Sequence, residues 1–86
     1  MAYEVRLYRP ARRYLERCDR PTQKRLIERI EALSENPYSH SKLLENAQGK
    51  RSSRVGKLRI IFEVDEQEKL LHVLTIAPRG EVYRRL

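Results

Sequence analysis

The sequence predicts a two-layer α+β fold, in which an N-terminal strand and a helical hairpin pack on one face of an antiparallel sheet that ends in a three-strand meander. Two observations lead to this prediction. The spacing of apolar residues has the period of a strand at the N-terminus, of a helix up to residue 36, and of a strand again from residue 50. The 86 residues are enough for one domain only, so residues 1–86 are expected to form a single domain.

The first strand and the first helix are expected from the N-terminal segment. Residues 3–8 alternate between two faces, with Tyr3, Val5 and Leu7 on one of them. Pro10 suits the first turn of a helix. The apolar stripe of this short helix has the spacing i, i+3, i+4 and i+7 and consists of Ala11, Tyr14, Leu15 and Cys18.

The second helix is expected to begin at the break Asp19-Arg20-Pro21 and to end at Asn36-Pro37. Its inward-facing residues are expected to be Leu26, Ile27, Ile30 and Leu33. So short a break between two helices indicates an antiparallel helical hairpin. Residues 37–49 are then a polar loop with one apolar anchor, Leu43-Leu44.

The C-terminal half has the alternation of strands. One face of the strand at 58–65 is expected to carry Leu58, Ile60, Phe62 and Val64, and the opposite face Arg59, Ile61, Glu63 and Asp65. Residues 65–68 form a turn, and residues 70–76 are almost wholly apolar, which predicts a central strand buried on most of both faces. The helical hairpin covers one face of this sheet and leaves the other face open.

Gly56-Lys57 is interpreted as a two-residue turn of type II′ between two strands. This register pairs Val55 with Leu58, Arg54 with Arg59, and Ser52 with Ile61. The residues expected on the helix side are Val55, Leu58, Ser53 and Ile60, and those on the open face are Lys50, Ser52, Arg54 and Arg59. Like charges directly opposite each other on a sheet destabilise it by a few tenths to about 1 kcal/mol. The Arg54/Arg59 pair is therefore expected to bind an anion such as a phosphate or a carboxylate.

The charge of the chain also predicts a polyanionic partner. The formal net charge is +7, and segment 50–59 contains five cations and no acid, namely Lys50, Arg51, Arg54, Lys57 and Arg59. RNA, DNA or an acidic protein fits this surface, whereas no apolar run is long enough to span a membrane and no membrane partner is expected. The single cysteine, Cys18, excludes an internal disulfide and is typical of a reducing cytoplasm.

Few side chains are candidates for proton transfer. His72 is expected to be a packed strand residue and His40 a solvent-exposed loop residue; they are too far apart in sequence to suggest zinc, and no metal or cofactor is expected. Arginine cannot act as a base near neutral pH, so Lys50 or Tyr83 is expected to move protons. Tyr83 follows Arg79 by four residues, and a nearby guanidinium favours the phenolate form of a tyrosine.

The string Arg54-Val55-Gly56-Lys57-Leu58-Arg59-Ile60-Ile61-Phe62, followed by an acidic turn, an apolar strand and Pro78-Arg79-Gly80-Glu81-Val82-Tyr83, resembles the RelE/ParE superfamily of toxins from toxin–antitoxin pairs. The resemblance covers nearly the whole chain and implies the RelE-like fold. For RelE-like members it implies an mRNA interferase, an endoribonuclease that cuts mRNA in the ribosomal A site without a metal. The ribose 2′-OH attacks the adjacent phosphate and leaves a cyclic 2′,3′-phosphate and a 5′-OH.

By position, the resemblance implies catalytic roles for five residues. Arg59 and Arg79 would stabilise the charge of the phosphorane. Arg54 and Lys50 would hold or protonate phosphate oxygens, and Tyr83 would orient, or exchange a proton with, the attacking or leaving oxygen. The residues expected to bind the substrate around them are Arg51, Ser52, Lys57 and Arg84.

The chain departs from the usual pattern at three points. Leu58 replaces the common tyrosine before Arg59, Ser52 stands where some ribosome-dependent members carry a second lysine, and no histidine lies near the C-terminus. The identity of the general acid is therefore open. The resemblance implies a cognate antitoxin, bound in a hetero-oligomeric complex, and the ribosome as partners. Two alternatives are a ParE-like inhibitor of DNA gyrase and a non-catalytic module that binds nucleic acid and antitoxin.

Overall fold

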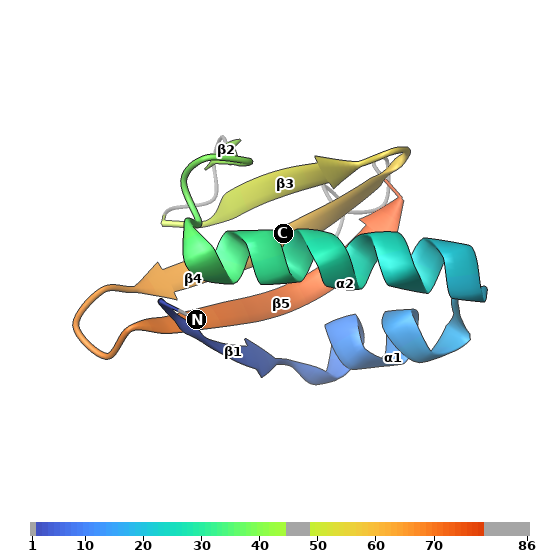
Figure 1. The fold of residues 1–86 in the computed structure, drawn as a ribbon, viewed down its shortest axis with the longest axis horizontal. Coiled ribbons are helices and arrows are strands. Elements are labelled where there is room, and N and C mark those ends of the chain that lie inside the picture. Colours follow the sequence, from blue (N-terminus) through green and yellow to red (C-terminus); the bar gives the residue numbers. More distant parts are fainter. Residues whose placement is uncertain (1, 45–48, 79–86) are drawn as a thin grey trace.

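A computed structural model describes residues 2–44 and 49–78 of the chain. Figure 1 shows two helices and a five-stranded sheet. In chain order the elements are β1 (Glu4–Leu7), α1 (Arg9–Arg17), α2 (Arg20–Glu35), β2 (Lys42–Leu43), β3 (Arg51–Val55), β4 (Leu58–Asp65) and β5 (Leu70–Pro78). The order across the sheet is β1-β5-β4-β3-β2. The two-layer α+β prediction and the meander of β3, β4 and β5 are confirmed.

The sheet is mixed, whereas the sequence predicted an antiparallel one. β1 runs parallel to β5, with Val5 opposite Leu71, and the other neighbours are antiparallel. Both helices and three strands separate β1 from β5 in the chain, so no tight turn imposes an antiparallel pairing on them. The predicted loop 37–49 also contains β2, which pairs with β3 at the sheet edge. Two residues are too few to display a strand period, so no strand was predicted there.

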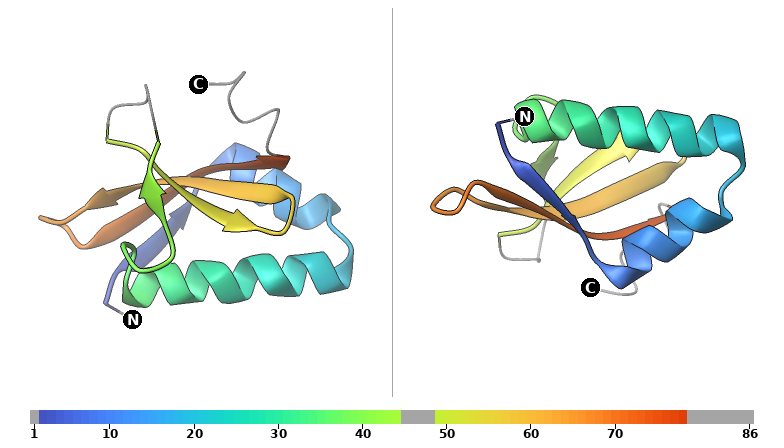
Figure 2. Two further views of the ribbon diagram at one scale, coloured as in Figure 1. Left: turned by 90° about the horizontal axis from the view of Figure 1, so that it is seen from above. Right: turned by 60° about the horizontal axis from the view of Figure 1, so that its bottom comes forward.

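The two helices begin and end where the prolines and the polar residues predicted. Pro10 and Pro21 occupy the first turns of α1 and α2, and α2 ends at Glu35, with Asn36 as its C-cap. Figure 2 shows α2 lying along one face of the sheet, and α1 packs on β5. Within residues 2–44 and 49–78, no helix combines the length and the hydrophobicity needed to cross a membrane.

The core between the helices and the sheet contains the predicted apolar residues with one exception. Leu26, Ile30 and Leu33 of α2 are buried, but Ile27 is 44% exposed, so its predicted inward position is wrong. Successive helical residues are rotated by about 100°, and Ile27 is therefore turned away from the stripe that begins at Leu26. The other residues of this core include Tyr3, Ala11, Leu15, Val55, Ile60, Phe62, Leu71, Val73 and Ile76.

The open face of the sheet has a small apolar cluster of its own. It consists of Leu44, Ile61 and Ala77, with the half-buried Leu74 packed against them. Leu74 takes part because β5 has a bulge: Ile61 pairs with Thr75, while the next residue, Phe62, pairs with Val73. Leu74 is thus an extra residue without a partner in β4.

A cluster of polar side chains ties the β4–β5 turn to the N-terminus and to the segment after α2. Glu66 accepts hydrogen bonds from the Tyr3 hydroxyl at 2.8 and 2.9 Å, from the Tyr38 hydroxyl, and from Lys69 Nζ at 3.0 Å. The Tyr38 hydrogen bond, followed by those of Tyr3 and Lys69, lowers the pKa of Glu66 to about 2. The same bond to Glu66 raises the pKa of Tyr38 to about 12. These shifts link the cluster to the pH dependence of folding.

Candidate anion-binding cleft

The hairpin of β3 and β4 has the predicted register. Val55 pairs with Leu58, Arg54 with Arg59, and Ser52 with Ile61. Gly56 has a φ of +60°, and Lys57 is not among the described residues with positive φ, as a type II′ turn requires. The pair next to such a turn exchanges both backbone hydrogen bonds, so Arg54 and Arg59 form the following, more closely spaced pair.

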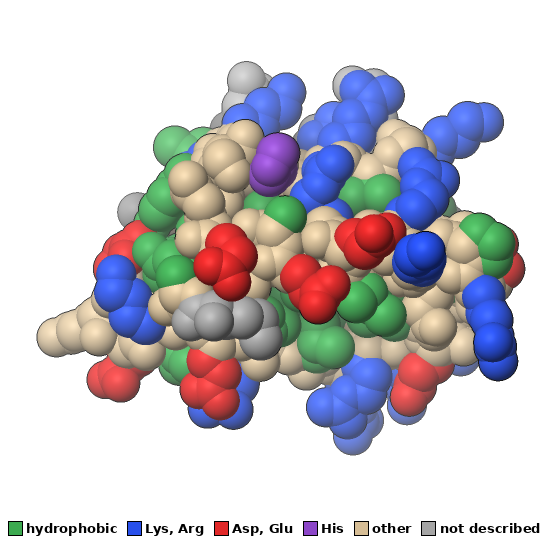
Figure 3. All heavy atoms as spheres, in the orientation of Figure 1, with side chains coloured by type: hydrophobic (Ala, Val, Ile, Leu, Met, Phe, Trp, Pro, Cys, Tyr) green, Lys and Arg blue, Asp and Glu red, His purple; other side chains and the backbone are tan. Residues whose placement is uncertain are grey.

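These two arginines line a cleft of about 280 Å³ on the open face. Its lining residues come from β3, β4, β2 and the segment before β2, and they are His40, Ser41, Lys42, Ser52, Arg54 and Arg59. No carboxylate is among them. Figure 3 shows Lys and Arg side chains gathered over the β3–β4 hairpin, with a His side chain nearby. The cleft therefore presents cations and hydroxyl groups to a ligand, which is the chemistry of an anion site.

Arg59 is the buried cation of the cleft. Its side chain is 4% exposed, and its Nη1 donates a hydrogen bond to Ser52 Oγ at 2.9 Å. Ala77, which belongs to the apolar cluster of the open face, pairs with Arg59 across the strands. A charge held against apolar groups is less screened by water, so Arg59 acts on a nearby anion more strongly than a surface arginine does.

Arg54 is exposed and is held mainly through its backbone. Arg29 of α2 donates one hydrogen bond from Nη1 to the Arg54 carbonyl oxygen at 2.7 Å and another to Ser53 Oγ at 3.0 Å. Arg54 Nε donates to the carbonyl oxygen of Gly56 at 3.3 Å. The helix thus anchors β3, and Arg54 lines both the cleft and a second hollow shared with Arg25, Glu28 and Arg29 of α2.

Two predicted site residues lie elsewhere in the fold. Arg51 donates to Ser41 Oγ at 2.9 Å and to the Ser41 carbonyl at 3.2 Å, and it lies 5.0 Å from the ring centre of Tyr38. It holds the segment before β2 and does not line the cleft. Lys57 lines a separate hollow of about 820 Å³ next to Arg17 and Arg25.

Lys50 does not line the cleft and is engaged with an acid. Its Nζ lies 3.4 Å from Glu63 Oε1, and Lys50 is not among the residues that line the cleft. Glu63 was expected on the open face of the strand at 58–65. The predictions for Arg79, Tyr83 and Arg84 fall outside the described residues. Pro78, the last residue that the structure describes, pairs with Leu58 beside the hairpin turn.

His40 and Lys42 are site residues that sequence reasoning missed. Lys42 pairs with Ser52 across β2 and β3, which brings it next to the arginines. The segment that carries His40 is fixed to β3, because Ser53 Oγ donates to the His40 carbonyl oxygen at 2.6 Å. The motif Lys42-Leu43-Leu44 signals this edge only weakly, and no local pattern marks His40. Within the described residues, no group of three His, Cys, Asp or Glu side chains is placed to hold a metal ion.

Comparison with known proteins places the chain in a family. A family model described as the ParE toxin of the type II toxin–antitoxin system parDE matches residues 5–83. The chain belongs to this toxin family. Membership of the RelE/ParE superfamily, predicted from the hairpin and the tail motif, is thereby confirmed. A search of curated proteins gives no significant match for the toxin.

Solved structures of RelE toxins share the fold of this toxin. The RelBE2 toxin–antitoxin complex from Mycobacterium tuberculosis gives a TM-score of 0.80 at 26% identity, over 92% of this chain and 100% of that chain. The archaeal RelE–RelB complex from Pyrococcus horikoshii OT3 gives 0.80 at 23% identity, over 93% and 98%. The isolated RelE toxin of E. coli gives 0.78 at 17% identity, over 98% and 94%. The last two show similarity of fold alone.

Proposed function

We propose that the toxin is a ribosome-dependent mRNA endonuclease and that the cleft binds the scissile phosphate. The observation that carries this proposal is the Arg54/Arg59 pair: two like charges are held opposite each other in a cleft whose lining contains no carboxylate. A phosphate between them replaces their repulsion with two favourable contacts, and the planar guanidinium can bind it through two hydrogen bonds. Arginine at this position is better suited to a phosphate ester than to a neutral ligand.

The proposed reaction is an attack by the ribose 2′-OH on the adjacent phosphate. The 2′-oxygen forms a bond to phosphorus, the bond to the 5′-oxygen breaks, a base takes the 2′-proton, and an acid gives a proton to the leaving oxygen. Arg59 is preorganised by Ser52 and would stabilise the charge on the phosphate oxygens without rearrangement. Arg54 and Lys42 would hold the same phosphate, and the step uses no metal.

Proton transfer is the role for which His40 is the new candidate. Imidazole gains and loses a proton readily near neutral pH, which neither arginine in the cleft does. His40 lines the same cleft as Arg59, and its backbone is fixed by Ser53. It would share proton transfer with Tyr83 and Lys50, while Arg79 would add a second cation for the phosphorane.

The partners proposed for the toxin follow from its relatives. Several of the matched structures are complexes of a RelE-type toxin with its RelB antitoxin. A cognate antitoxin would bind this toxin in a hetero-oligomeric complex and neutralise it, and the ribosome with mRNA in the A site would be its target in the cytoplasm. The second candidate function is inhibition of DNA gyrase, because the matching family model is that of ParE.

Mapping of mRNA 5′ ends on ribosomes after induction of the toxin tests this proposal. New 5′ ends within A-site codons are expected for the wild type and should be strongly reduced in Arg59→Gln, Arg79→Ala and Tyr83→Ala. His40→Gln should reduce cleavage as well, whereas the matched variant His72→Gln should not, because His72 lies on β5 beside Tyr8 and outside the cleft. Intact A-site codons in the wild type would refute the endonuclease, and DNA breaks with an SOS response would then support gyrase as the target.

A further inference from the structure

A second concentration of arginines lies on α1, away from the cleft. Four of the nine residues of α1 are arginines and one is an acid. Arg9, Arg13 and Arg17 follow one another at a spacing of four residues and therefore share one side of the helix. Together with Pro10 and Tyr14 they line a hollow of about 290 Å³. The hollow shares no residue with the cleft.

The arrangement of Arg9 and Arg13 opposes the stability of the helix, whereas Arg17, in the last turn, is placed favourably for the helix dipole. Like charges four residues apart on a helix repel each other. Cations in the first turn also interact unfavourably with the positive end of the helix dipole, and the first turn of α1 has no acid. Glu16 is three residues from Arg13, yet within the described part of the chain no ion pair joins it to an arginine of α1. Three arginines in a row therefore call for an external anion.

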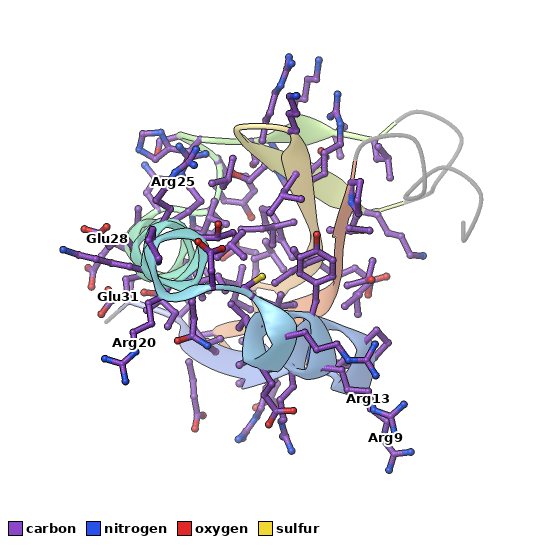
Figure 4. All side chains as sticks on the ribbon, turned by 90° about the vertical axis from the view of Figure 1, so that its right-hand side faces the viewer. Arg9, Arg13, Arg20, Arg25, Glu28 and Glu31 are labelled. Atoms are coloured by element: carbon purple, nitrogen blue, oxygen red, sulfur yellow. The ribbon has the colours of Figure 1, made fainter. Side chains whose placement is uncertain are left out.

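On the exposed side of α2, by contrast, acidic side chains balance the cations. Arg20 and Lys24 also stand four residues apart, but Glu28 and Glu31 line the same shallow hollow and balance their charge. Figure 4 shows Arg9 and Arg13 pointing away from the core beyond α1, at the lower right, whereas Arg20, Glu28 and Glu31 extend around α2 at the left. The cleft lies on β2, β3 and β4, whereas α1 packs on β5 in the other half of the sheet, so the arginine row is a site separate from the cleft.

We propose that Arg9, Arg13 and Arg17 form a second site that binds the sugar–phosphate backbone of RNA. Successive members of the row rise by about 6 Å along the helix axis, so one extended backbone can contact several of them. A guanidinium group can bind two phosphate oxygens at once, and its planar face can stack on a base. The inference rests on the proposed function in taking RNA as the ligand, but it concerns binding and not cleavage.

The test measures binding of a short single-stranded 2′-O-methyl RNA, which lacks the attacking 2′-OH, over a range of salt concentrations. The variant Arg9→Gln/Arg13→Gln is compared with Arg20→Gln/Lys24→Gln, which removes the same charge at the same spacing from α2. Loss of two phosphate contacts should lower the slope of log K against log salt by about 1.4 in the α1 variant, and the α2 variant should keep the wild-type slope. Thermal denaturation checks that both variants fold.

Equal slopes in the two variants would overturn the proposal. So would an α1 variant that keeps the wild-type slope for RNA but loses affinity for the cognate antitoxin, because the row would then be a protein-binding surface. Cleavage of mRNA on ribosomes by the wild type separates the two proposals. If the wild type cleaves mRNA but the two variants have equal salt slopes, only the RNA-binding role of the arginine row is refuted. If the slopes differ as expected but the wild type does not cleave mRNA on the ribosome, only the endonuclease proposal is refuted.

Discussion

Replacement of Arg54 by glutamine should stabilise the toxin while weakening its anion site. Arg54 and Arg59 are opposed in the closely spaced type of cross-strand pair, and such a like-charge pair destabilises a sheet by about 0.2–1 kcal/mol. Arg54 is exposed and its bond to Gly56 O is lost in the variant, so we expect a gain of about 0.5 kcal/mol at low salt. For a domain of this size that corresponds to a rise in Tm of about 2–4 °C.

Salt and phosphate provide the decisive comparisons. The Debye length falls from about 10 Å at 0.1 M to about 3 Å at 1 M salt, so the difference between wild type and Arg54→Gln should shrink in high salt. Inorganic phosphate at about ten times its Kd should stabilise the wild type by about 1.4 kcal/mol and the variant by clearly less. Urea denaturation in chloride and in phosphate measures both effects. Lys57→Gln removes a charge from the turn of the same hairpin and serves as the control.

The reasoning fails if Arg54→Gln is no more stable than the wild type in low-salt chloride. It also fails if phosphate stabilises Arg54→Gln as much as it stabilises the wild type. An equal gain from Lys57→Gln would show that the net charge of +7, and not the cross-strand pair, sets the effect.

Two further predictions concern the rest of the fold. The lowered pKa of Glu66 contributes stability that is present above about pH 4.5 and is lost as the pH falls toward about 2. The free energy of unfolding should therefore fall over this range in the wild type and in Glu68→Gln, but less in Glu66→Gln. Urea denaturation at each pH measures it. Leu26→Ala should reduce the free energy of unfolding by about 2–5 kcal/mol, because Leu26 is fully buried, whereas Ile27→Ala should change it by about 0.5 kcal/mol or less; similar losses for the two would contradict the assignment of Ile27 to the surface.

Local patterns in the sequence predicted the elements whose geometry is set by near neighbours. Pro10 and Pro21 placed the helix starts, and Gly56 placed the turn whose register brings Arg54 opposite Arg59. The prediction that Ile27 faces inward was wrong. The apolar stripe of a helix is several residues wide, and only the packing partners decide which residue at its edge is buried.

The parts that the sequence did not predict depend on contacts between distant segments. The parallel pairing of β1 with β5 and the edge strand β2 have no local signature. His40 and Lys42 enter the cleft only because β2 pairs with β3, and Arg51 turns from the cleft to bind Ser41. Charge clustering along the chain therefore pointed to the candidate cleft but not to all of the residues that line it.

The bulge in β5 allows this strand to lose one residue at one position without a change of register. Deletion of Leu74 would leave Val73 opposite Phe62 and Thr75 opposite Ile61, with no other pair displaced. Deletion of Ile76 would instead move Thr75 or Ala77 into its place against the helices. The chain nevertheless has Leu74, whose side chain packs with Ile61 and Ala77 beneath the open face and not in the main core. The extra residue thus enlarges the apolar cluster that contains Ala77, the cross-strand partner of Arg59, and a homologue shortened by this one residue would keep the fold while losing part of that cluster.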